Sequence, residues 1–166
     1  MAIGNTGKGV RRVITGERPD GRSRVWLDGD APNVKRPTEK IQSVLLWATA
    51  GSPADYSTDE DAGQWQLGTS PPFMGSRFVH FTLAPGGERT EPHRNDTVDL
   101  TVCVSGELTF YFDDGSVVLR PGETLVQRGT MHHIANHGDV PAVTVTVLLD
   151  GAPKRDGSLE RDEQAR

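Results

Sequence analysis

Short β-prone runs separated by glycine and proline turns fill the second half of the chain and constrain its fold more than any other feature. Residues 78–83 alternate, with Val79 and Phe81 on one face and His80 on the other, because successive side chains of a strand point to opposite sides. The further runs of this kind are 97–104, 107–112, 116–119, 125–127 and 142–149. Strands this short and this closely spaced predict an all-β sandwich or barrel.

The first half of the chain predicts two strand-rich segments. Residues 11–15 and 24–28 are β-prone and flank Pro19-Asp20-Gly21, a turn signal that predicts a β-hairpin. Residues 29–40 contain two prolines and are expected to form an extended connector. The apolar run 43–49 is short enough to be a buried strand.

A long polar stretch, residues 51–75, follows that strand. Loops of this length inside a compact domain are usually functional or disordered. Trp65 and Phe73 favour an ordered flap that lies on the rest of the domain. A flap of this kind would let Trp65 close a substrate pocket.

The length and charge of the chain limit its class. A chain of 166 residues suits one domain, expected over 10–150 with its core at 77–149, a flexible start at 1–9 and a charged tail at 151–166. A net charge of −5 argues against nucleic acid or an anionic membrane as a partner. No apolar run approaches the roughly 20 residues of a membrane span, and we expect a cytoplasmic protein. The single cysteine, Cys103, excludes an intrachain disulfide.

Histidine and carboxylate side chains recur within residues 87–136. His93, Asn95 and Asp99 share a parity, so an unbroken strand would point them to one face, and His132 and Asn136 share another. If the two segments oppose each other, two imidazoles and one carboxylate converge. Such a set holds non-haem iron, and it also serves manganese, nickel, cobalt or zinc. The alternative is that His93 lies in a surface loop and His132 is a hydrogen-bonded core histidine.

Two glycine-bounded motifs frame these residues. They are Gly87-x5-His93-x-Asn95-x3-Asp99-x6-Gly106 and Gly122-x4-Gln127-x-Gly129-x2-His132-x3-Asn136. Both resemble the motifs of the cupin superfamily, and the second is similar to a variant found in small single-domain bacterial cupins. The resemblance implies an RmlC-like jelly roll: a double-stranded β-helix barrel, here with an N-terminal β-hairpin extension.

The resemblance also implies a ligand set for a divalent transition metal (Fe, Mn, Zn, Ni or Co). His93, Asp99 and His132 stand at ligand positions of the motifs. Asn95 replaces the second histidine and offers only a neutral amide oxygen, a poorer ligand. Asp99 stands where the family has a longer glutamate, so it must approach the ion more closely.

Other side chains are candidates for roles beside the metal. His80, Gln127 and Glu91 are possible proton carriers, and the alternative for His80 is a core histidine. The substrate-binding candidates are Cys103, Trp65 and Asn136. For Cys103 and Trp65 the alternative is ordinary core packing.

Three functions remain open from the sequence. The first is a metal-dependent lyase, dehydratase, decarboxylase or cyclase acting on a carbonyl- or carboxylate-bearing small molecule. The second is a non-haem Fe(II) dioxygenase with a two-His-one-carboxylate site. The third is a non-enzymatic barrel that binds or senses a small molecule. By resemblance we also expect a homodimer, in which the hairpin of residues 10–28 extends the partner's sheet.

Overall fold

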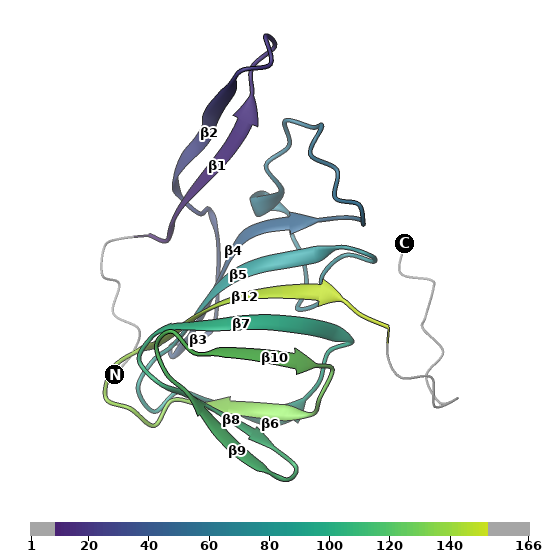
Figure 1. Cartoon of the computed structure of the whole chain (residues 1–166). Helices are drawn as coiled ribbons and strands as arrows, with labels where there is room; N and C mark the ends of the chain where they lie inside the picture. The colour runs from purple at the N-terminus through teal and green to yellow at the C-terminus, as the bar shows by residue number, and fades with distance from the viewer. Residues whose placement is uncertain (1–8, 153–166) are drawn as a thin grey trace.

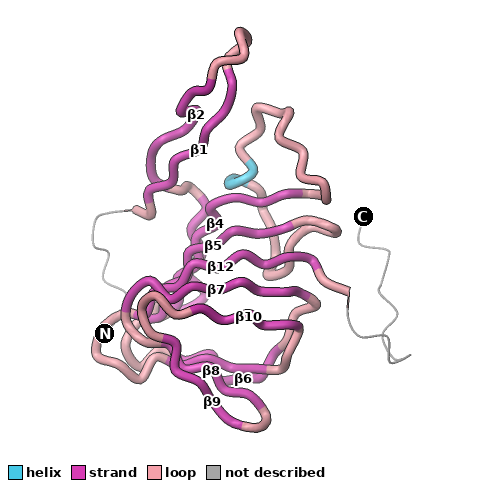
Figure 2. The backbone as a smooth tube through the Cα atoms, in the orientation of Figure 1, coloured by secondary structure: helices cyan, strands magenta, loops and turns pink. Residues whose placement is uncertain are grey.

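The computed structural model describes residues 9–152, and this part of the chain is nearly all β (Figures 1 and 2). Its elements are β1 (Arg11–Glu17), β2 (Ser23–Asp30), β3 (Asn33–Thr38), β4 (Ile41–Thr49), the 3-10 turn η1 (Ala62–Gln64), β5 (Ser76–Leu83), β6 (Glu88–His93), β7 (Thr97–Ser105), β8 (Leu108–Phe112), β9 (Gly115–Leu119), β10 (Thr124–Arg128), β11 (His132–Ala135) and β12 (Ala142–Asp150). No helix in this part of the chain is both long and apolar enough to cross a membrane.

Two antiparallel sheets form the jelly-roll barrel that the sequence predicts. One has the order β10-β7-β12-β5-β4-β3 and the other the order β6-β11-β8-β9. Their inner faces share one hydrophobic cluster, in which Leu83 and Cys103 of the first sheet pack with Leu108, Phe110 and Ile134 of the second. Apolar residues at alternate strand positions therefore fill the space between the sheets.

The predicted N-terminal hairpin is confirmed. Strands β1 and β2 pair antiparallel from Arg11↔Asp30 to Glu17↔Ser23 and form a two-stranded sheet of their own. The turn contains Gly21 with a φ of 78°, a conformation that glycine adopts at little cost. Figure 1 shows this hairpin projecting from the barrel.

Two expectations about local structure are corrected. The connector expected at 29–40 contains the strand β3, which lies at the edge of its sheet and therefore tolerates Pro37. The condition of one unbroken strand through His93 and Asp99 is not met, because His93 ends β6, Asp99 lies in β7 and these two strands belong to different sheets. The shared parity of the two residues is thus not what brings them to one site.

The expected flap over residues 51–75 is ordered on the barrel. Trp65 and Leu67 pack against the buried cluster of Leu45, Val79 and their neighbours. The loop is also tied to its surroundings by polar side chains that donate to its carbonyl oxygens, among them Asn33 Nδ2 to Trp65 O at 2.7 Å. The expected flexible start at 1–9 and charged tail at 151–166 lie almost wholly outside the described residues.

Candidate active site

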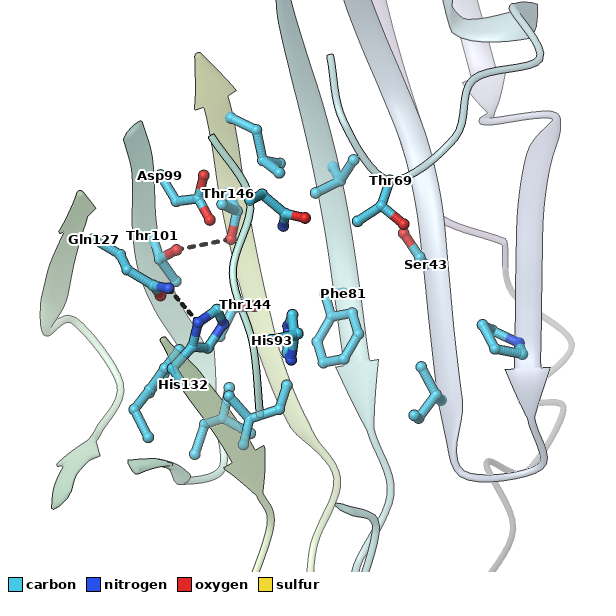
Figure 3. A pocket seen from close by; sticks show the side chains of 18 of the residues that line it. Ser43, Thr69, Phe81, His93, Asp99, Thr101, Gln127, His132, Thr144 and Thr146 are labelled. Carbon is cyan, nitrogen blue, oxygen red and sulfur yellow. Dashed lines mark hydrogen bonds between the residues drawn. The ribbon is translucent and has the colours of Figure 1, made fainter. Parts of the chain in front are cut away.

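A cavity of about 790 Å³ lies between the two sheets. Its wall on the six-stranded sheet is built in rows, because residues directly opposite each other on paired strands share a face. The first row runs Gln127↔Asp99↔Leu148↔Arg77, the second Thr101↔Thr146↔Val79 and the third Thr144↔Phe81↔Ser43. All of these side chains line the cavity. The pairing of the strands thus places alternate residues of each strand on one face, which forms the cavity wall (Figure 3).

The other sheet contributes two histidines. His93 and His132 are direct partners across β6 and β11, and their ring centroids are 4.3 Å apart. His132 is buried, with 7% of its surface exposed. The antiparallel register, rather than proximity in sequence, brings the two imidazoles together. His93 lies in a strand and not in a surface loop, whereas His132 is buried and hydrogen-bonded, as the alternative had it, and lies beside His93.

A backbone carbonyl faces one ring nitrogen of each histidine. His93 Nδ1 lies 3.1 Å from Glu91 O, and His132 Nδ1 lies 3.0 Å from Thr130 O. A carbonyl oxygen can only accept, so a proton on Nδ1 completes each of these contacts and leaves Nε2 as the basic nitrogen in that tautomer. Histidines that bind a metal through one nitrogen commonly donate from the other to a carbonyl in this way.

Gln127 lies against the same nitrogen of His132. Its Nε2 is 2.5 Å from His132 Nδ1 and 3.3 Å from Thr130 O. A bond donated by Gln127 to Nδ1 would place the ring proton on Nε2, whereas a bond from Nδ1 to Thr130 would leave Nε2 basic. Gln127 and Thr130 therefore choose between two tautomers of His132. Gln127, a proton-carrier candidate from the sequence, lines the cavity beside His132.

Asp99 is partly buried in the cavity wall. Its Oδ1 is buried and has no hydrogen-bond partner. Burial raises the pKa of the Asp99 carboxyl above its ordinary value, against smaller opposing effects of a hydrogen bond from Thr97 and of the charge of His132. A buried oxygen without a partner is costly unless a cation or donor satisfies it.

The three expected ligands, His93, Asp99 and His132, line one cavity, and the rings of His93 and His132 contact each other. Within residues 9–152 no group of three or more His, Cys, Asp or Glu side chains lies close enough to hold a metal ion. In kind, the donors fit a divalent metal: two imidazoles with basic Nε2 atoms and a carboxylate oxygen that lacks a partner. Asn95 also lines the cavity.

His80 and Cys103, two of the expected site residues, do not line the cavity. His80 alternates with the cavity-lining Val79 and Phe81 and is therefore on the other face of β5. Burial lowers the pKa of His80, whose Nδ1 has no partner. Cys103 is sealed in the core, where its Sγ contacts Gly106 O at 3.5 Å, and burial raises the pKa of this thiol.

Trp65 and Asn136 also lie outside the lining and have structural contacts instead. Trp65 donates from Nε1 to Glu60 Oε1 at 2.6 Å while its ring packs on the barrel. Asn136 is fully buried and donates from Nδ2 to Leu83 O and Val140 O, each at 2.8 Å. Its role is to hold the loop after β11 against the end of β5.

Several cavity residues are not among the site residues expected from the sequence. The most informative is Arg77, which shares the parity of Val79 and Phe81 at the start of the same strand. The shared parity of these three residues predicts that Arg77 lies on the same face of the strand as Val79 and Phe81. Lys35, Ser43 and Thr69 also line the cavity, together with Glu91, which was a proton-carrier candidate.

The lining gives the cavity two chemically different ends. Figure 3 shows His132 with Asp99 and Gln127 on one side, Ser43 and Thr69 on the other, and His93 beside Phe81 between them. Thr101 Oγ1 and Thr146 Oγ1 are hydrogen-bonded at 3.0 Å. Hydroxyls, imidazoles and apolar side chains in one cavity of this size suit a small, oxygen-bearing organic molecule.

The chain is similar to known proteins in sequence and in structure. The family model described as "Cupin domain" matches residues 79–148. The chain is 30% identical over 150 residues to the cupin-domain-containing oxidoreductase fogC of Aspergillus ruber, covering 85% of this chain and 72% of that protein. It is also 30% identical over 151 residues to the oryzines biosynthesis cluster protein J of Aspergillus oryzae, covering 87% and 84%. Among solved structures, a Cupin 2 conserved barrel domain protein from Salinispora arenicola has a TM-score of 0.48 and 14% identity, covering 71% of this chain and 82% of that one.

Proposed function

The chain belongs to the cupin family, and on this basis we propose that it is a metal-dependent small-molecule enzyme of lyase, dehydratase, decarboxylase or cyclase type. One observation carries the proposal: the paired imidazoles of His93 and His132, each with Nδ1 on a carbonyl, share a cavity with the unpartnered Oδ1 of Asp99. The curated relatives described above are fungal, so the small bacterial, RmlC-like type stays a prediction from the motifs.

Three residues that line the cavity would hold the ion after their side chains close around it, because in the described part of the chain they are not close enough to do so. The Nε2 atoms of His93 and His132 are the basic nitrogens, and Asp99 supplies the anionic oxygen. A divalent ion bound there would act as a Lewis acid on a carbonyl or carboxylate oxygen of the substrate. Iron, manganese, zinc, nickel and cobalt all accept this donor set.

The chain's own side chains supply the remaining chemistry. The exposed carboxylate of Glu91 lines the cavity two residues before His93 and would accept a proton from the substrate. The Thr101 and Thr146 hydroxyls line the wall between the two ends and can bond substrate oxygens. The carbonyl of Thr130 would keep His132 oriented by accepting from Nδ1.

Metal analysis tests the proposal. The wild type, His132→Ala and Asp99→Ala are purified alike and measured by inductively coupled plasma mass spectrometry, with circular dichroism as the check on folding. His133→Ala is the matched control, because His133 stacks on Tyr111 at 4.5 Å and does not line the cavity. We expect about one metal per chain in the wild type and the control, and a loss of at least tenfold in the other two. Equal metal content in all four proteins would refute the ligand set.

A second candidate is a non-haem Fe(II) dioxygenase. The relative in Aspergillus ruber is named an oxidoreductase, which favours redox chemistry. Oxygen uptake by the Fe(II)-loaded protein that rises when an organic substrate is added would support this candidate over the lyase type. A small-molecule binding or sensing barrel is the outcome if the folded wild type holds no metal.

The partners follow from the same proposal. The substrate is a small organic molecule, and the net charge of −5 disfavours nucleic acid and anionic membranes. A cytoplasmic location stays a prediction from the sequence.

A further inference from the structure

Arg77 is a buried cation of the cavity wall, three strands away from Gln127, which contacts His132. It occupies the first row of the wall, two strands beyond Asp99, with Leu148 of β12 between them. Neighbouring strands lie about 4.8 Å apart, so the backbones of Asp99 and Arg77 are roughly 10 Å apart. The cavity wall thus has a carboxylate near the histidines and a guanidinium well beyond it.

The guanidinium is only partly satisfied. Arg77 is 7% exposed and lines the cavity. Its Nη1 donates to Thr69 O, whereas its Nε is buried and has no hydrogen-bond partner. No carboxylate in the described part of the chain forms an ion pair with it. Burial also lowers the pKa of Arg77, a sign that its charge lacks compensation.

The cavity's own carboxylates leave this charge uncompensated. Glu88, Glu91 and Asp99 line the same cavity, yet none of them pairs with Arg77. A buried charge is stabilised by an ion partner, and the planar fork of a guanidinium matches a carboxylate with two parallel hydrogen bonds. An anionic group entering the cavity would therefore find its best partner at Arg77.

We propose that Arg77 anchors the carboxylate of the substrate, so that the substrate is an organic acid whose reacting group lies several bonds away, toward His93 and His132. The wall between the two ends has the apolar side chains of Leu148 and Phe81 beside the hydroxyls of Thr101 and Thr146. The direction of the reacting group rests on the function proposed above. Binding of the carboxylate to Arg77 does not depend on that function.

A purely structural role for Arg77 makes a different prediction. Through Thr69 O the residue tethers the flap, as Lys35 does by donating from Nζ to Leu67 O. Lys35 also lines the cavity but is exposed. Lys35→Met therefore removes a cationic tether of the same loop without removing the buried guanidinium, and serves as the matched control.

Isothermal titration with two pairs of probes tests the proposal. Each pair is an acid and its neutral amide: hexanoate with hexanamide, and 4-phenylbutyrate with 4-phenylbutyramide. We expect the wild type and Lys35→Met to bind at least one acid tenfold or more tightly than its amide. Arg77→Met should lose this preference while binding the amide as before, which also shows that it is folded. Arg77→Lys, which keeps the charge without the fork, should show an intermediate preference and carries the test if Arg77→Met is unstable.

The His132→Ala variant separates this inference from the metal proposal. Because Arg77 alone holds the carboxylate, the preference for the acid should persist in His132→Ala whether or not metal is lost. Disappearance of the preference in His132→Ala would place the anion at the histidine end and overturn the role of Arg77. Equal binding of acids and amides by the wild type, or an unchanged preference in Arg77→Met, would overturn it as well.

Discussion

Arg77 and Asp99 flank Leu148 in one row of the six-stranded sheet, and each keeps a buried polar atom without a hydrogen-bond partner in the same cavity. Opposite charges on adjacent strands would pair and neutralise each other. One intervening strand prevents this here, and both charges remain directed at whatever occupies the cavity. Because β12 lies between β7 and β5, the carboxylate of Asp99 and the guanidinium of Arg77 stay apart and can bind different groups of one ligand.

The Asn95→His substitution should strengthen metal binding. Asn95 lines the cavity and occupies the position at which the family motif has a second histidine. An imidazole is a better ligand for a transition metal than a neutral amide oxygen, so we expect at least a tenfold lower dissociation constant for Zn²⁺ or Co²⁺. Titration calorimetry with each ion measures the change.

The neighbouring residue offers a control for that experiment. Asp96 is exposed and does not line the cavity, so Asp96→His adds a histidine to the same turn outside the site. Its affinity for the metal should match that of the wild type. A similar gain in both variants would mean that any added histidine binds metal, and the site would not be the one proposed.

Asn136 is expected to stabilise the fold and to have no direct role in ligand binding. Asn136→Ala leaves the buried carbonyl of Leu83 and the partly buried carbonyl of Val140 without their shared donor, Asn136 Nδ2. An unsatisfied buried acceptor costs about 1–3 kcal/mol, so we expect a loss of roughly that size or more in the free energy of unfolding. Urea denaturation measures it. Metal content per folded chain should stay unchanged, and a selective loss of metal would return Asn136 to the site.

The Arg12–Asp61 ion pair should make the stability of the protein depend on pH. The pair joins the hairpin to the flap, and the two side chains are 8% and 12% exposed. Hydrogen bonds from Arg12 are the main cause that lowers the pKa of Asp61. A carboxyl with a lowered folded pKa contributes stability above its unfolded pKa of about 3.9 and loses it as the pH falls through the folded value.

The Asp61→Asn substitution tests this dependence. It leaves a buried guanidinium without its counter-charge, and breaking such a pair costs about 3 kcal/mol. Urea denaturation should show the full difference from the wild type near neutral pH and a shrinking difference below about pH 4. Asp28→Asn breaks the exposed pair with Arg11 and should cost much less. A difference for Asp61→Asn that does not change with pH would contradict the assignment.

The barrel was predictable because its signals are local. Alternation in the strands and the turn glycines lie within a few residues of each other, and Gly106, Gly122 and Gly129 have φ values of 67°, 86° and 59° in the structure. The histidine pair could be inferred from the glycine-bounded motifs. Its geometry depends on the pairing of β6 with β11, which no local pattern specifies.

The parts that were missed depend on contacts between distant segments. Arg12 and Asp61 are 49 residues apart in the sequence, so no short motif predicts their ion pair. Residues 88–93 contain charged residues and Pro92 rather than alternating apolar ones, which hid the edge strand β6. Arg77 had the right parity, but its lack of an ion partner follows only from the register of three strands.

The outer face of the six-stranded sheet is expected to form a homodimer contact. Five apolar side chains of β5, β7 and β10 are exposed there, on the side away from the cavity: Phe78, Leu100, Val102, Val104 and Val126. A contiguous apolar surface on a sheet is typical of a protein–protein interface. The projecting hairpin, with Val25 60% exposed, is the second surface that we expect to contact a second copy of this chain.

Size-exclusion chromatography with light scattering measures this prediction. We expect a dimer for the wild type and a monomer for Val102→Lys, because a lysine charge desolvated in an apolar contact is strongly unfavourable. Val25→Lys tests the hairpin separately without removing Arg12, whose ion pair a deletion of the hairpin would destroy. If only Val25→Lys dissociates the dimer, the hairpin carries the contact. A wild type that is monomeric at about 50 µM, well above a micromolar dissociation constant, contradicts both surfaces.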